Sequence, residues 1–186
     1  MAVIEKVSPE EALERVQGAL GDQASVRLNF DHVDVTCDRS KLVDVMTTLR
    51  DAEGIRCRYF GFLSAVDRSE FPLEEGQQAP EMPLEVLVHV YSPEFVIQCF
   101  VHVPVELTGA VCPSITGVYG GAIWHERECH EMFGIDFEGH PRLVGLYLPE
   151  DFEGHPGLRS FKLPSRALVK SWPGAKDPDE AAAGGR

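Results

Sequence analysis

Seven histidines and 30 carboxylates are the side chains of this sequence that could bind a metal ion or carry a proton. The densest group lies on one stretch, where His125, Glu128 and His130 stand close together. Zinc proteases place two histidines four residues apart on a helix, so that both rings face one ion. Here the two histidines are five residues apart, about 140° around a helix. A free-standing metal hydrolase using these residues is therefore a rival interpretation, which metal analysis would test.

The five cysteines do not follow a ligand pattern. No two of them form a C-x-x-C pair, which an iron–sulfur cluster or a structural zinc site usually contains. Cys57 and Cys99 fall at apolar positions of strand-like runs. We expect five reduced, inert thiols and no metal ligands among them.

Signatures of nucleotide binding and of nucleophilic catalysis are missing from the sequence. The glycine-rich stretch 117–121 precedes a helix pattern but lacks the lysine of a P-loop and the spacing of a dinucleotide fingerprint. No G-x-S-x-G occurs, and the adjacent Cys129 and His130 would point about 100° apart on a helix. The sequence does not predict catalysis by this chain alone.

Charge and composition narrow the classes of partner. The 186 residues carry a formal charge of -13, which repels phosphate backbones and anionic membrane surfaces, so no nucleic-acid partner is expected. The most apolar stretch, 95–105, is interrupted by polar residues and is too short for a membrane span. The first six residues do not resemble a secretory signal. We expect a soluble, cytoplasmic chain.

The elements that would position such side chains follow from periodicity. Ser8, Pro9 and Glu11 form a helix-start signal, and Gly21 ends the apolar helical pattern that follows. Alternating runs at 26–30 and 33–35, joined at Asp31-His32, predict a hairpin. A second helix is predicted over 40–50, with its apolar face formed by Leu42, Val45, Met46 and Leu49.

Further strands and a last helix complete the predicted domain. Residues 56–66 alternate, with Cys57, Tyr59, Gly61, Leu63 and Ala65 on one side. A loop is expected over 67–83, strands over 84–90 and 95–105, and a helix over 122–133. This order predicts an α+β fold, an antiparallel or mixed sheet covered by helices on one face, over residues 1–134.

The sequence changes character after Gly134. It becomes rich in Pro, Gly and His, and Asp136–Pro141 (DFEGHP) recurs as Asp151–Pro156, both read as turns. We expect 135–176 to be an extended tail without a core of its own that lies over a partner protein, and 177–186 to be disordered. His140 and His155, each before a proline, are expected to clamp these turns by hydrogen bonds rather than to bind a metal.

One run identifies a family resemblance. Residues 124–135 read WHERECHEMFGI, and the two G-H-P turns follow at a fixed spacing. This pattern, over about 35 residues, resembles the 30-kDa subunit family of the bacterial respiratory NADH:quinone oxidoreductase (complex I). Related chains occur in membrane-bound [NiFe] hydrogenases and in the chloroplast NDH complex.

The resemblance implies a non-catalytic structural subunit of an electron-transport translocase. Such a chain carries no cofactor, while FMN and iron–sulfur clusters belong to partner subunits. It would pack in the peripheral arm, on the cytoplasmic face of the cell membrane, and hold the quinone-site and iron–sulfur subunits together. The same fold in a membrane-bound [NiFe] hydrogenase is the alternative, distinguished by a co-purifying large subunit with paired C-x-x-C motifs.

The resemblance also implies a set of interface residues. They come from the charged helix and the two turns: Trp124, Glu126, Arg127, Glu128, Phe133, His140, Pro141, Leu143, Pro149, His155, Pro156 and Arg159. Two departures from the family pattern stand out. Val144-Gly145 replace two arginines, and Gly157 with an altered basic pair follows the second turn. The basic contacts that the family makes at these positions are therefore not expected to be the same here.

Overall fold

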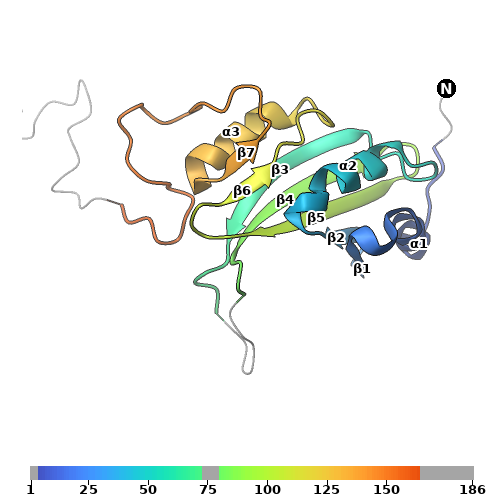
Figure 1. The fold of residues 1–186 in the computed structure, drawn as a ribbon. Helices are drawn as coiled ribbons and strands as arrows, with labels where there is room; N and C mark the ends of the chain where they lie inside the picture. Colours follow the sequence, from blue (N-terminus) through green and yellow to red (C-terminus); the bar gives the residue numbers. More distant parts are fainter. Residues whose placement is uncertain (1–3, 73–79, 164–186) are drawn as a thin grey trace, which may run out of the picture.

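A five-stranded mixed sheet forms the centre of the computed structural model, which describes residues 4–72 and 80–163 (Figure 1). The strand order is β1-β2-β5-β4-β3, with β2 parallel to β5 and the other neighbours antiparallel. The elements are α1 (Pro9–Leu20), β1 (Ser25–Asn29), β2 (His32–Thr36), α2 (Leu42–Asp51), β3 (Tyr59–Asp67), β4 (Leu84–Ser92), β5 (Ile97–Val105), β6 (Val111–Pro113), α3 (Ala122–Phe133) and β7 (Asp136–Glu138). The α+β prediction is confirmed.

The first helix begins and ends where its sequence signals predict. The Oγ of Ser8 accepts a hydrogen bond from the Glu11 N–H at 3.2 Å, and Pro9 occupies the first helical position. Gly21 follows the helix with a φ of 52°, a value that suits glycine. The second helix starts at Leu42, two residues later than predicted, because Arg39–Lys41 form a 3₁₀ turn.

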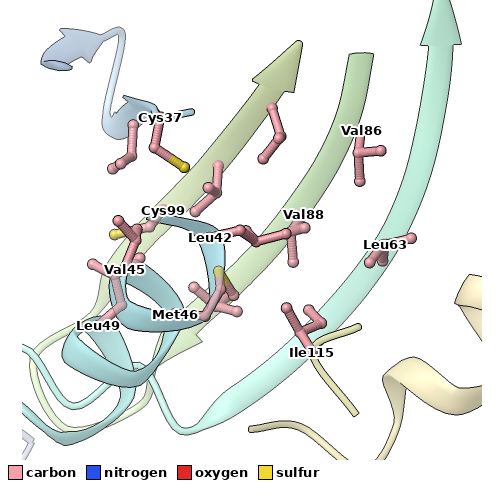
Figure 2. Close-up of a cluster of buried hydrophobic side chains, with 14 of the residues drawn as sticks. Cys37, Leu42, Val45, Met46, Leu49, Leu63, Val86, Val88, Cys99 and Ile115 are labelled. Atoms are coloured by element: carbon pink, nitrogen blue, oxygen red, sulfur yellow. The ribbon is translucent and has the colours of Figure 1, made fainter. Parts of the chain in front are cut away.

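The core lies between one face of the sheet and the helices α1 and α2. Figure 2 shows Leu42, Val45 and Met46 of α2 facing the inner side chains of β4 and β5. All of these side chains are buried, as predicted from their helical spacing. The five cysteines are free and buried, and burial raises the pKa of Cys37 to about 12.

The opposite face of the sheet carries aromatic and charged residues. Phe62, His89 and Phe100 stack in a row across β3, β4 and β5. His102 lies between two carboxylates, with its Nδ1 2.8 Å from a Glu85 oxygen and its Nε2 3.4 Å from an Asp34 oxygen. The hydrogen bond with Glu85 raises the pKa of His102. This face is therefore polar at one end and aromatic at its centre.

Two details of the strands differ from the prediction. A bulge at Gly61, between Phe60 and Phe62, shifts the alternation, so Tyr59 pairs with Tyr91 on the face opposite Leu63. The hairpin turn consists of Phe30 and Asp31 rather than Asp31 and His32, because His32 pairs with Asn29 as the first residue of β2.

A small parallel pair, β6 and β7, was not predicted. β7 is the first DFE of the repeat, which was read as a turn, and its Phe137 is 3% exposed. Ile135 is fully buried in the same core. The packed part of the chain thus continues beyond Gly134, and deleting residues from 135 onward would remove core side chains. The division at 135 and the tail beyond 163 remain predictions, and 164–186 lie outside the described residues.

Candidate partner interface

Helix α3 has one buried face and one face that carries the C-terminal segment. Ala122, Glu126 and Cys129 are buried at helical spacing, and the helix lies beside the edge strand β3. The helix ends at Gly134, whose φ is 74° and whose N–H donates to the His130 carbonyl at 2.9 Å. After β7 the chain passes along α3 and loops out beyond its end (Figure 1), and residues 146 and 155 bond back to the helix.

Glu126 is not an interface residue, contrary to the prediction. Its side chain is fully buried and accepts hydrogen bonds from the Ile115 N–H and the Ser114 hydroxyl, both at 2.7 Å. Burial raises the pKa of this carboxyl above its usual value. The charge that suggested contact with a partner instead holds the 114–116 turn against α3.

Arg127 binds the following loop. Its Nε donates to the Val144 carbonyl at 2.8 Å and its Nη2 to the Gly145 carbonyl at 2.6 Å. The guanidinium also lies 5.2 Å from the ring of Trp124, which remains 59% exposed. The acceptors at the Val144-Gly145 departure are backbone carbonyls, so Arg127 fixes the main chain of this loop and not its side chains.

Glu131 holds the loop after α3, a role that was not predicted from the sequence. Its two carboxylate oxygens accept the backbone N–H groups of Leu146, Tyr147 and Leu148 at 3.0, 2.8 and 3.1 Å. Burial alone would raise the pKa of Glu131, but these donors and Arg127 hold it below its usual value. Its place four residues after Arg127, on the same face of the helix, was the available signal.

Both G-H-P turns are clamped by their histidines, as predicted. The Nδ1 of His140 accepts the Arg142 N–H at 3.0 Å, so its Nε2 is the donor to the Ile123 carbonyl, also at 3.0 Å. The Nδ1 of His155 lies 2.9 Å from the Glu131 carbonyl. The turns are thus fixed to α3 of the same chain.

Gly157 fits a site that has no room for a side chain. Its N–H donates to the Met132 carbonyl at 2.8 Å, and a Cβ there would lie 2.8 Å from both that oxygen and the Phe133 ring. Gly157, the second departure from the family pattern, therefore allows the backbone to pass close to the end of α3.

Replacing Gly157 with alanine is expected to destabilise the chain by about 1–3 kcal/mol, because neither backbone nor ring can yield without strain. The midpoint of urea unfolding would measure this. Gly117→Ala is the matched control, since a Cβ at Gly117 meets nothing within 4 Å. Equal midpoints for the two variants would refute the packing argument.

Near its end, the segment is also bonded to Asp67, the last residue of β3. The buried Asp67 accepts the Arg159 N–H at 2.9 Å, and the Nε of Arg159 donates to the Asp67 carbonyl at 3.1 Å. The guanidinium of Arg159 lies 4.3 Å from the ring of Phe71. Arg159, predicted as a partner contact, thus has partners within its own chain while remaining exposed.

Five large apolar side chains of α3 and of the segment after it are exposed, and we call them the C-terminal surface: Trp124, Val144, Tyr147, Phe152 and Leu163. Of the predicted interface residues, Pro141 and Pro149 are also exposed, whereas Glu128, Phe133, Leu143 and Pro156 are half-buried. A cavity of about 630 Å³ lies between Glu131 and the 142–150 loop. The geometry suits contact with another protein.

The rival metal site is not assembled. His125 Nδ1 lies 3.0 Å from the Leu63 carbonyl, and His130 Nδ1 lies 3.0 Å from the Ile135 carbonyl. Within residues 4–72 and 80–163, no three His, Cys, Asp or Glu side chains are grouped to hold a metal ion. His125, Glu128 and His130 therefore do not converge.

Comparison with known proteins gives one family. The model described as respiratory-chain NADH dehydrogenase, 30 Kd subunit, matches residues 35–167. The C-type subunit of NADH-quinone oxidoreductase from Mycolicibacterium gilvum is 32% identical over 76% of this chain and 62% of the relative. The corresponding protein of Roseiflexus sp. is 35% identical over 74% of this chain and 75% of the relative. The combined C/D protein of Pseudomonas fluorescens is 34% identical over 69% of this chain but only 21% of the relative.

Two solved structures share the fold. A trypsin-resistant fragment of Nqo5 superimposes with a TM-score of 0.56 at 23% identity, covering 71% of this chain and 99% of the fragment. A chain of the membrane-bound sulfane sulfur reductase, an archaeal respiratory membrane complex, gives a TM-score of 0.63 at 17% identity, covering 91% of this chain and 96% of that one. The chain spans about three-fifths of its Mycolicibacterium relative.

Proposed function

Because this chain belongs to the 30-kDa subunit family of respiratory-chain NADH dehydrogenases, we propose that it is a structural subunit of a complex I-type NADH:quinone oxidoreductase. In this role it lies in the peripheral arm and holds the quinone-site and iron–sulfur subunits at electron-transfer distance. The contact is made by the C-terminal surface, with Trp124 and Tyr147 as its aromatic anchors.

The observation that carries this proposal is that hydrogen bonds hold the C-terminal segment on α3 while its aromatic rings stay exposed. Arg127, Glu131, His140 and His155 all bond to backbone atoms of other parts of the chain, so the segment is held on α3 by the chain itself. Trp124 and Tyr147 nevertheless remain 59% and 63% exposed. A rigid backbone with exposed aromatic rings lowers the entropic cost of binding, as expected for a docking surface.

A fused relative supports a direct neighbour within the same complex. The combined C/D protein of Pseudomonas fluorescens carries the matching stretch as a fifth of its length. Two subunits that work in one chain are expected to touch, so a C-type chain and another subunit would share an interface. The identity of that neighbour as the quinone-site subunit is part of our proposal.

We propose further that the chain contributes no catalytic residue and binds no cofactor, and that FMN and the iron–sulfur clusters belong to its partners. The charged and histidine side chains of α3 support this, because their hydrogen bonds fix backbone segments. The proposed place is the cytoplasmic face of the cell membrane. Among the described helices, none is long and apolar enough to cross a bilayer.

A second candidate host is a related membrane complex with different redox chemistry, such as a [NiFe] hydrogenase. The observation in its favour is the fold likeness to the sulfane sulfur reductase chain, which extends over 91% of this chain. The fold alone therefore serves complexes that differ in their electron acceptor.

The test is affinity purification of a tagged chain from mildly solubilised native membranes, with mass spectrometry of the co-purifying subunits. Recovery of flavin- and iron–sulfur-bearing subunits with a quinone-site subunit is the expected result. Recovery of a nickel-binding large subunit would instead identify the host complex as a hydrogenase. A chain recovered alone would overturn both candidate hosts. Analysis of its zinc and iron content would then test whether it is a metal hydrolase.

A further inference from the structure

The end of the sheet where β2, β3 and β5 begin contains unusual backbone. Among the described residues, three that are not glycine have a positive φ: Phe30 at 53°, Arg56 at 49° and Val96 at 60°. Each one shortly precedes a strand, β2, β3 or β5. Such conformations are unfavourable for residues with a Cβ, and they persist where something compensates them.

These turns are neighbours in space. The parallel register of β2 and β5, with Val33 opposite Cys99, brings the Phe30-Asp31 turn beside Val96 and Ile97. Asp31, Val96 and Ile97 line one cavity of about 170 Å³. Arg56 reaches the same end through its Nη1, which lies 2.9 Å from an Oε of Glu94. The Phe30-Asp31 turn joins β1 and β2, at the edge of the sheet opposite β3, which is the strand that α3 contacts.

Two of the three strained residues are compensated within the chain. Arg56 forms its ion pair with Glu94, and Val96 is half-buried, with its N–H donating to the Ser92 carbonyl at 2.8 Å. Phe30 differs, because its side chain is 90% exposed and gains almost nothing from burial.

The turn chemistry makes Phe30 still more unusual. It is the first residue of a two-residue connection between antiparallel strands, since Asn29 pairs with His32. Such hairpins use turns with a positive φ at this position, where glycine or asparagine is favoured. A phenylalanine here has both a strained backbone and an exposed apolar ring, and the described residues supply no compensation for either.

We propose that Phe30 anchors a second protein contact, in which its ring enters an apolar pocket of another subunit. The inference rests on the proposed function, because it requires a multi-subunit host. The neighbouring Asp31 carboxylate is 79% exposed and the whole chain carries -13, so the pocket that fits has lysine or arginine at its rim. This contact lies apart from the C-terminal surface, so the chain bridges two neighbours.

The first test is photo-crosslinking in the purified complex, with p-benzoylphenylalanine in place of Phe30 in one preparation and of Tyr147 in another. Position 30 is expected to crosslink to one other subunit, at apolar residues flanked by lysine or arginine. An adduct within the same chain or with a second copy would overturn the inference. So would no adduct from position 30 when position 147 crosslinks, which leaves the proposed function standing. Failure at both positions overturns both proposals.

The second test separates contact from folding. Phe30→Gly suits the turn, so the urea midpoint of the free chain should stay equal or rise. In competition with wild type for incorporation into the complex, the same variant should lose about tenfold. Phe30→Met, which keeps an apolar side chain, is the matched control and should compete within about threefold. Equal incorporation of Phe30→Gly and wild type would overturn the inference.

Discussion

Replacing Glu126 with alanine is expected to lower the free energy of unfolding by about 2–4 kcal/mol. The change orphans the buried N–H of Ile115 and removes the partner of the Ser114 hydroxyl, each now 2.7 Å from a carboxylate oxygen. It also leaves a cavity at a fully buried position of α3. Urea unfolding of the purified chain would measure the loss.

Two variants make that experiment specific. Glu126→Gln retains an oxygen that can accept the Ile115 N–H and should cost about 1 kcal/mol or less. Glu128→Ala, on the same helix but half-buried, should change stability by about 0.5 kcal/mol at most. If Glu126→Ala and Glu126→Gln unfolded at the same urea concentration, the buried acceptor would have no structural role.

Replacing Glu131 with alanine is expected to release the 144–148 loop and to reduce assembly about tenfold. Three backbone donors, those of Leu146, Tyr147 and Leu148, lose their common acceptor, which removes about 1–3 kcal/mol of local stability. Because binding requires the ordered loop, its apparent affinity falls with the ordered fraction. Hydrogen exchange of these amides and recovery of the complex would measure the two effects.

The same site has a defined pH dependence. The pKa of Glu131 is lowered in the folded chain, so its stabilising contribution is present above the ordinary carboxyl pKa and is lost as pH falls through the lowered value. Amide protection in the loop should therefore decline on acidification below about pH 4.5 in the wild type. Glu131→Gln should remove this dependence, whereas Glu138→Gln, an exposed carboxylate on β7, should preserve it. A wild-type loop equally protected at all pH values would contradict the assignment.

Features that depend on residues close together in the sequence could be predicted from it. The Ser8 cap, the Gly21 stop and the buried face of α2 each involve residues within a few positions, and all three are confirmed. Tyr59 was assigned to the wrong face because a bulge at Gly61 depends on pairing with β4. The unpredicted β6 and β7 are three residues each and pair across 25 positions, a contact without a local signal.

The candidate site shows the same division. The clamping roles of His140 and His155 were predictable from the G-H-P turns. The charges of Glu126 and Arg127 suggested a partner, and Glu131 was not selected, because the groups that these side chains bond to lie 11 to 18 residues away. A charged helix looks the same in sequence whether it bonds to another protein or to its own chain.

The parallel pairing of β2 with β5 has a consequence for biosynthesis. Cys99 is made 66 residues after Val33, its partner in the sheet. At a synthesis rate of about 5–20 residues per second, β2 waits roughly 3 to 13 s for β5 to follow it out of the ribosome. During this interval the β1–β2 hairpin has an unpaired edge that can recruit strands from other nascent chains. A chaperone that covers the nascent N-terminal third during this interval would prevent such pairing.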